Sequence, residues 1–112
     1  MINVTTRPWG LYEELYENPS YKVKRIIINP NQSFSLQYHN NRDEVWTIVE
    51  GSGIIKNGEM VKRCTAGDIF NIPAKQIHRA TAGSLGLVFI EVQRGYCKEE
   101  DIVRLDDDYG RT

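Results

Sequence analysis

The stretch that decides the fold runs from Ser35 to Gly51 and reads SLQYHNNRDEVWTIVEG. It holds one of the chain's two histidines, His39, with Gln37 two residues before it and Glu44 five residues after it. Residues two apart on an extended strand point to the same face, so Gln37 and His39 are expected to project together. The polar segment 40–43 predicts a turn to an antiparallel neighbour, which would bring Glu44 back beside them.

The other histidine, His78, closes the sequence GDIFNIPAKQIH, which predicts a strand followed by a turn. Two imidazoles, a carboxylate and an amide oxygen suit a divalent first-row transition metal. We therefore predict a metal site made of Gln37, His39, Glu44 and His78. Two alternatives remain open at this point. Gln37 could orient His39 by a hydrogen bond instead of binding metal, and Glu44 could merely pair with Arg42 on the surface.

Composition sets limits on the class of protein. A chain of 112 residues predicts one domain, residues 1–112. Lysine and arginine number 14 against 15 acids, so the net charge of -1 gives no basis for a nucleic-acid or membrane partner. Neither a secretory leader nor an apolar run of membrane-spanning length is evident, and we expect a cytoplasmic protein. Cys64 and Cys97 are expected to be free thiols, with a disulfide left open.

The remaining sequence predicts strands separated by turns. Strands are expected at 21–28, 33–39, 44–50, 68–72, 77–81 and 85–93. Glycine-containing segments at 51–53 and 82–84 predict turns, and Asn57-Gly58 predicts a two-residue type I′ hairpin. Residues 11–17 could form a helix or an edge strand, and the charged tail 98–112 predicts a solvated terminus. This pattern favours an all-β antiparallel barrel or jelly roll.

Within the strand 33–39, the polar face would line the barrel and carry Gln37 and His39. Phe34, Leu36 and Tyr38 would lie on the opposite face, against another apolar layer such as the N-terminal segment or a partner subunit.

Two spaced motifs then resemble those of a known superfamily. Gln37-x-His39-x4-Glu44-x6-Gly51 resembles the first cupin motif with glutamine in place of its first histidine, and Gly67-x5-Pro73-x4-His78 resembles the second. The resemblance implies a cupin-type double-stranded β-helix. The segments RPWG, YKVKRI, SLQYH, IEVQ and IVRLDDDYGR, between Arg7 and Arg111, together resemble the C-terminal isomerase domain of type II mannose-6-phosphate isomerases. That domain is often fused behind a mannose-1-phosphate guanylyltransferase, and this chain is expected to be the isomerase domain alone.

The resemblance implies a metal-dependent aldose-ketose isomerase that interconverts mannose 6-phosphate and fructose 6-phosphate. One divalent ion is expected, zinc first, with manganese, cobalt, nickel or iron as alternatives, because a Lewis acid can polarise the sugar oxygens. Arg42 is assigned to catalysis, and Arg104 and Arg111 to the substrate phosphate, which a guanidinium fork suits. The general base is left open among Arg42, Lys22, Lys24 and Lys75.

Several positions depart from the family pattern. Asn40, Asn41 and Val45 stand where the family usually has histidine, and Asn31 and Lys75 stand where it usually has glycine. These departures keep two alternatives open: another metal-dependent cupin enzyme, such as an iron-dependent dioxygenase, and a non-catalytic sugar-binding domain. A homodimer is expected because pairing would cover exposed strand edges.

Overall fold

The computed structural model describes residues 2–112, which form nine β-strands and no helix. No helix able to cross a membrane is therefore found in this range. The strands are β1 (Asn3–Arg7), β2 (Gly10–Glu17), β3 (Tyr21–Ile28), β4 (Leu36–Tyr38), β5 (Arg42–Asn57), β6 (Met60–Thr65), β7 (Ile69–Ile72), β8 (His78–Gly95) and β9 (Val103–Asp106).

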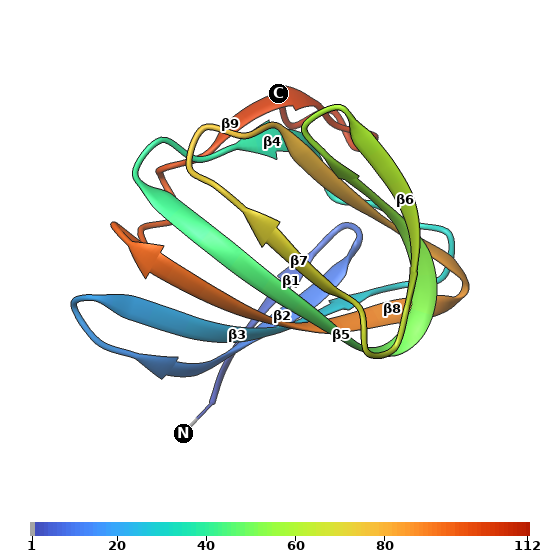
Figure 1. Cartoon of the computed structure of the whole chain (residues 1–112), viewed down its shortest axis with the longest axis horizontal. Helices are drawn as coiled ribbons and strands as arrows, with labels where there is room; N and C mark the ends of the chain where they lie inside the picture. Colours follow the sequence, from blue (N-terminus) through green and yellow to red (C-terminus); the bar gives the residue numbers. More distant parts are fainter. Residues whose placement is uncertain (1) are drawn as a thin grey trace.

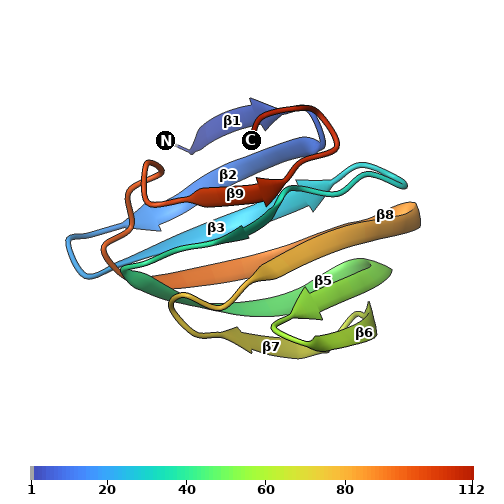
Figure 2. The same cartoon turned by 90° about the horizontal axis from the view of Figure 1, so that it is seen from above.

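All strand pairings are antiparallel, and the sheet curls into an open-ended barrel (Figure 1). One path of neighbours follows the order β1-β2-β3-β8-β4-β9, while β5 pairs with β6, β7 and β8. Seen from above, β1 to β3 lie on one side of the barrel, β5 to β7 on the other, and β8 between them (Figure 2). The prediction of an all-β antiparallel barrel is confirmed.

The barrel interior changes character along its length. Inward positions of β3, β5 and β8 at one end are apolar: Ile26, Ile28, Trp46, Ile48, Leu87 and Phe89. At the other end the same strands bury charged and amide side chains: Lys22, Lys24, Arg42, Glu44, Glu91 and Gln93. Buried charges are costly unless they are paired or bind a ligand. The polar end is therefore the place to look for a site.

Two expected turns are instead bends within long strands. Residues 51–53 do not end a strand, because β5 continues to Asn57 with register shifts between Ile48 and Glu50 and between Gly51 and Gly53. Residues 82–84 likewise lie inside β8. A Cβ atom on Gly53 would lie 2.1 Å from the Thr81 carbonyl oxygen. These glycines allow two bent strands to approach closely. In the sequence, glycines with this role have the same pattern as glycines in a turn.

Three further expectations change in detail. The hairpin loop is Gly58-Glu59, and only Gly58 has a positive φ, 63°, so the predicted type I′ turn at Asn57-Gly58 is wrong. The strand expected at 33–39 shortens to Leu36–Tyr38. Phe34 lies in the core and lines the same cavity as Gln37, so it is not on an opposite face. Its ring centroid is 5.8 Å from that of Trp9, in the N-terminal segment that was expected as its apolar neighbour.

Both ends of the chain are more ordered than their composition suggests. Residues 10–17 form a strand that pairs with β1 on one side and β3 on the other, so they are neither a helix nor an edge strand. The tail is not a solvated terminus, because β9 pairs with β4 and the side chains of Asp101 and Asp107 are buried. Both chain ends thus contribute to the barrel wall.

Candidate metal centre

The sequence-predicted ligands meet at the polar end of the barrel, where Gln37, His39 and Glu44 line a cavity and His78 is fully buried beside them. His39 follows β4, Glu44 lies on β5 and His78 begins β8. Gln37 is the direct cross-strand partner of His78, so their side chains lie on one face. His39, Glu44 and His78 are all buried. Strand pairing and the short connection from β4 to β5 therefore bring together four residues that are up to 41 positions apart, from 37 to 78.

The donor atoms of three residues form a compact cluster. His39 Nε2 lies 3.4 Å from Glu44 Oε2, and His78 Nε2 lies 4.0 Å from Glu44 Oε1. One donor atom from each residue lies within 4.8 Å of the other two. Metal–ligand bonds of about 2.0–2.2 Å require neighbouring donors roughly 3–4 Å apart. The separations in this cluster fit that requirement.

Both histidines present an unprotonated Nε2 to the cluster. His39 Nδ1 lies 2.6 Å from the Asp101 carbonyl oxygen, and His78 Nδ1 lies 2.9 Å from that of Gln76, so each Nδ1–H donates to the backbone. Burial, together with the charge of Arg42, lowers the pKa of His39 to about 4, and burial lowers the pKa of His78 to about 4. His78 Nε2 is buried without a hydrogen-bond partner. Neutral, backbone-oriented imidazoles beside a carboxylate fit a divalent cation.

Gln37 has a different relation to the cluster. Its Oε1 accepts a hydrogen bond from Ser35 Oγ at 2.6 Å, and its Nε2 lies 3.4 Å from His39 Nε2. An amide nitrogen is not a metal ligand, so in this orientation Gln37 orients neighbouring groups. A half-turn of the amide would place its oxygen toward the cluster.

Arg42 is enclosed by the candidate ligands. Its Nε donates to Glu44 Oε2 at 3.0 Å, and its Nη2 lies 3.2 Å from His39 Nε2. Its Nη1 donates to the Lys98 carbonyl oxygen at 3.3 Å. These contacts are buried, unlike the surface pair with Glu44 that the sequence left as an alternative. Arg42 thus links two candidate ligands to the loop that precedes β9.

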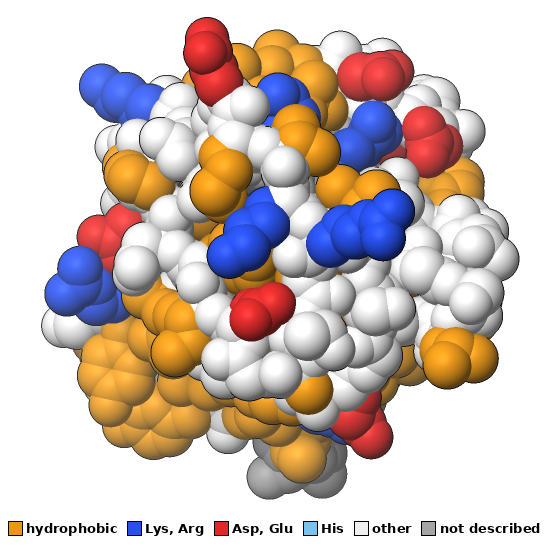
Figure 3. Space-filling view, turned by 45° about the vertical axis from the view of Figure 1, so that its right-hand side comes forward, with side chains coloured by type: hydrophobic (Ala, Val, Ile, Leu, Met, Phe, Trp, Pro, Cys, Tyr) orange, Lys and Arg blue, Asp and Glu red, His pale blue; other side chains and the backbone are white. Residues whose placement is uncertain are grey.

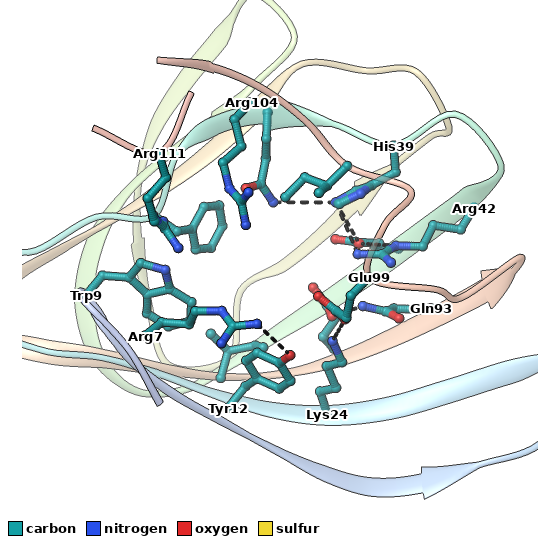
Figure 4. Close-up of a pocket in the computed structure, with 16 residues that line it drawn as sticks. Arg7, Trp9, Tyr12, Lys24, His39, Arg42, Gln93, Glu99, Arg104 and Arg111 are labelled. Atoms are coloured by element: carbon teal, nitrogen blue, oxygen red, sulfur yellow. Dashed lines mark hydrogen bonds and ion pairs between the residues drawn. The ribbon is translucent and has the colours of Figure 1, made fainter. Parts of the chain in front are cut away.

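Arginine side chains occupy the opposite side of the same cavity (Figure 4). Arg111 is held by Asp107 through contacts of 3.0 Å at Nε and 3.0 Å at Nη2. Arg104 Nε is buried and has no hydrogen-bond partner among the described residues. Burial and, to a smaller extent, the charge of Arg111 lower the pKa of Arg104. Arg7, from the end of β1, joins them. A cluster of guanidinium groups with one carboxylate partner is suited to an anion.

Three acidic residues and Arg7 belong to the cavity region but were not assigned from sequence. Glu91 is buried on β8, where burial and the charge of Glu44 raise its pKa to about 7. Glu99 lines the cavity from the loop before β9, and the Asp101 carboxylate binds the backbone N–H groups of residues 40 and 41. The alternation of β8 could have placed Glu91 inward. No local pattern identifies the other three, because tertiary contacts position them.

The positions that depart from the family pattern lie outside the cluster. The side chains of Asn40 and Asn41 are exposed, and Val45 alternates with the inward residues Glu44 and Trp46. Asn31 and Lys75 have φ angles of 62° and 69°, in the left-handed region that glycine adopts most easily. The departures therefore alter backbone strain and the outer surface, and they leave the candidate ligands in place.

Both histidines are buried and contribute little to the outer surface of the molecule. Basic and acidic side chains are interspersed on the face in Figure 3, and no histidine is visible there. Cys64 is a buried free thiol and Cys97 a partly buried one, so the open disulfide alternative is not realised.

Comparison with known proteins identifies relatives of this arrangement. Residues 2–107 match the family described as mannose-6-phosphate isomerase C-terminal. The xanthan biosynthesis protein XanB of Xanthomonas campestris pv. campestris is 43% identical over 95% of this chain and 23% of its own length. The alginate biosynthesis protein AlgA of Pseudomonas aeruginosa and the mannose-1-phosphate guanylyltransferase ManC of Salmonella typhimurium are each 39% identical, over 95% of this chain and 22% of theirs. The chain thus spans less than a quarter of these relatives.

Solved structures show the same fold at low sequence identity. Oxalate decarboxylase from Bacillus subtilis superposes with a TM-score of 0.83 and 16% identity, over 93% of this chain and 30% of its own. An RmlC-like cupin from Shewanella frigidimarina superposes with a TM-score of 0.77 and 20% identity, over 88% of this chain and 87% of its own. KdgF from Halomonas sp. superposes with a TM-score of 0.77 and 14% identity, over 88% of this chain and 91% of its own. The expected cupin double-stranded β-helix is confirmed.

Proposed function

Because this chain belongs to the mannose-6-phosphate isomerase C-terminal family, we propose that it interconverts mannose 6-phosphate and fructose 6-phosphate with a divalent metal ion. One observation carries the proposal: a single cavity is lined on one side by His39 and Glu44, two members of the His-Glu-His cluster, and on the other by an arginine cluster. A phosphorylated sugar needs both features. Its reacting oxygens need an electrophile, and its phosphate needs cationic donors.

The metal side would hold the reacting end of the sugar. His39, Glu44 and His78 would hold a divalent ion, zinc by preference, which would supply a Lewis acid for oxygens on C1 and C2. Arg42 keeps Glu44 and His39 in position through its two contacts. We assign Arg42 this positioning role within the catalytic site, because its donor groups are directed to the protein.

The arginine side would hold the phosphate. Arg111 is oriented by Asp107, and Arg104 offers an unpaired, buried Nε. Arg7 adds a third positive charge from the first strand. Fixed guanidinium groups can bind a phosphate in a forked geometry that a lysine ammonium cannot reproduce. This arrangement predicts a strong preference for phosphorylated sugars over free mannose.

The proposal is confined to the isomerase step. The relatives are much longer than this chain, and one is named for guanylyl transfer. A homodimer is proposed as well, because β1 pairs only with β2 among the described residues and leaves one edge open. Sedimentation velocity at several concentrations tests it, and a single monomeric species throughout would contradict it.

The decisive assay couples fructose 6-phosphate formation to a dye or cofactor readout. Purified protein is supplied in turn with zinc, manganese, cobalt, nickel and iron. We expect turnover of mannose 6-phosphate with at least one metal and far slower turnover of mannose. Arg111→Lys should raise KM for the phosphorylated sugar by about 10- to 100-fold, since a charged hydrogen bond contributes about 1.5–3 kcal/mol.

The matched control is Arg94→Lys. Arg94 also makes a forked pair, with Asp43 at 3.0 and 3.1 Å, but its side chain is 69% exposed and does not line the cavity. The KM of Arg94→Lys for mannose 6-phosphate should equal that of the wild type. Absent turnover in metal-loaded protein that still binds the sugar phosphate would favour a sugar-binding domain. Absent turnover and binding would favour a different cupin chemistry, such as iron-dependent oxygenation.

A further inference from the structure

The proposed reaction needs a group that accepts a proton from carbon, and the basic residues suggested by the sequence do not fit that role. The charges of Glu91 and Glu99 outweigh the effect of burial and raise the pKa of Lys24, which therefore stays protonated. Arg42 is permanently charged. Lys22 pairs with Glu17 at 3.3 Å and does not line the cavity, and Lys75 is exposed. Because the two imidazoles of the site are candidate metal ligands, the carboxylates of the cavity are the remaining candidates for the base.

Three glutamates line the cavity, and in two of them each carboxylate oxygen accepts a hydrogen bond from the protein. Glu44 accepts hydrogen bonds from Arg42 at Oε2 and from Trp46 at Oε1, each at 3.0 Å, within the candidate ligand cluster. Glu91 accepts one from Trp46 at Oε2, 3.0 Å, and one from Gln93 at Oε1, 2.6 Å. Both side chains are buried, and no oxygen of either carboxylate is without a protein donor.

Glu99 differs from both. Its Oε1 pairs with Lys24 Nζ, while Oε2 has no hydrogen-bond partner among residues 2–112. Its side chain is 42% exposed and lies between Lys24 and Arg42 at the cavity (Figure 4). Glu99 is thus the cavity glutamate with one oxygen accessible to a bound sugar.

The loop that carries Glu99 is attached to the metal side at both ends. Immediately before Glu99, the Lys98 carbonyl oxygen accepts a hydrogen bond from Arg42 Nη1. Two residues after it, the Asp101 carbonyl oxygen accepts one from His39 Nδ1. The Asp101 carboxylate binds the N–H groups of Asn40 and Asn41 at 3.0 and 2.9 Å. These contacts fix the position of Glu99 relative to the candidate ligands.

We propose that Glu99 is the general base that carries the proton between C2 and C1 of the sugar. This role rests on the isomerase function proposed above. Starting from the open-chain aldose, Glu99 Oε2 removes the proton from C2, the C–H electrons form the C1–C2 double bond, and the carbonyl electrons move to O1. Glu99 then returns the proton to C1 as O2 becomes the carbonyl and its hydroxyl proton passes to O1. Atoms and electrons balance without a co-reactant.

Lys24 acts as the positioning residue for this carboxylate. Its ammonium lies 4.0 Å from the centroid of the Tyr12 ring, which holds it beside Glu99. Burial raises the pKa of Glu99, but the charge and hydrogen bond of Lys24 lower it by more than burial raises it. The net shift is downward, so the carboxylate is ionised at neutral pH. An ionised carboxylate is the form that can accept a proton.

The test replaces Glu99 by glutamine, which preserves shape but removes basicity. We expect kcat to fall by about 10²- to 10⁴-fold, the usual contribution of a positioned base, while KM and bound metal change by less than about twofold. Substrate deuterated at C2 should show a larger primary isotope effect in Glu99→Gln than in the wild type. A merely structural role would not enlarge this isotope effect.

Glu100→Gln is the matched control. Glu100 is the next residue, is exposed, and accepts a hydrogen bond from Tyr96 at 3.1 Å. Its removal should leave kcat unchanged. As a second variant, Glu99→Gly should recover turnover when formate is added, because a small carboxylate can occupy the vacated space. Failure of formate to restore turnover, or a kcat of Glu99→Gln within tenfold of the wild type, would overturn the role of Glu99.

The outcomes separate this role from the function it rests on. If the metal-loaded wild type and Glu99→Gln both turn over the substrate, only the assignment of Glu99 as the base is wrong. Wild type without turnover removes the isomerase function, and the role of Glu99 with it. Turnover in the wild type, loss in Glu99→Gln and rescue of Glu99→Gly support both.

Discussion

The two sides of the cavity are built in different ways. On the metal side, His39, Glu44 and His78 are buried on or beside strands, and each imidazole is oriented by a backbone carbonyl. On the arginine side, Arg7 and Arg111 come from near the chain ends, and Arg111 depends on one carboxylate. The first side is organised by the sheet, and the second by side-chain pairs. Perturbations of the two sides should therefore have separable effects.

The largest expected effect comes from removing a candidate ligand. His78→Ala deletes one of the two imidazoles while leaving the arginine side intact. We expect the bound metal to fall from about one ion per chain to a small fraction, with turnover reduced by at least about 10³-fold, since both binding and Lewis-acid capacity are lost. Elemental analysis and the coupled assay measure the two effects. Calorimetric affinity for the sugar phosphate should fall much less than turnover.

Asn71→Ala serves as the control for this experiment. Asn71 lies on β7 with an exposed side chain and should leave metal content unchanged. If His78→Ala bound metal with wild-type stoichiometry, the ligand set would be wrong, and the distinction between the two sides would lose its basis.

The sequence predicted the two sides unequally, and the reason is physical. The alternation of Gln37 and His39 and the return to Glu44 follow from strand geometry, which is local. The C-terminal arginines were linked to the cavity only by resemblance, because composition alone favours a solvated tail. What orders that tail is the pairing of β9 with β4 and the hydrogen bonds of the buried Asp101 carboxylate to the backbone of residues 40 and 41, and no local pattern records such distant contacts.

Strand boundaries failed for a related reason. A glycine cluster predicts a turn because glycine adopts positive φ, and Gly51 does so at 78°. In this barrel the same residue also permits close approach, since a Cβ there would lie 2.1 Å from the Gly86 carbonyl oxygen. Sequence cannot separate a turn from a bend when both need glycine. The partner strand decides between them.

An intermediate effect is expected from loosening the arginine side. In Asp107→Asn, Arg111 loses its charged partner, so KM for mannose 6-phosphate should rise while metal content stays constant. The hydrogen bonds and charge of Arg111 hold the pKa of Asp107 below its usual value. A depressed carboxyl pKa adds stability that is present above the unfolded pKa of about 3.9 and is lost as the pH falls through the folded value.

The pH dependence of unfolding checks this assignment. The wild type should exceed Asp107→Asn in unfolding free energy by about 1.5 kcal/mol near neutral pH, as expected for hydrogen bonds to a charged group. The difference should be constant above about pH 5 and shrink on acidification below about pH 4. A difference that persisted unchanged at pH 2, or a loss of metal in the variant, would contradict the separation of the two sides.

The smallest effect is expected where the sequence departs most visibly from its family. Asn41 is exposed and contributes its backbone N–H to Asp101, while Val45 lies on the outer face of β5 with Asn71 and Val92 as cross-strand partners. A histidine at position 45 would point away from the ligand cluster, because strand alternation separates it from Glu44. Position 41 lies in the exposed bend before β5. Asn41→His and Val45→His should therefore change kcat/KM and metal affinity by less than about threefold, within the range of surface substitutions. An activity gain of tenfold or more in either variant would mean that the missing family histidines act on the reaction from outside the cavity. Unchanged activity would confine the determinants of turnover to the two sides of the cavity.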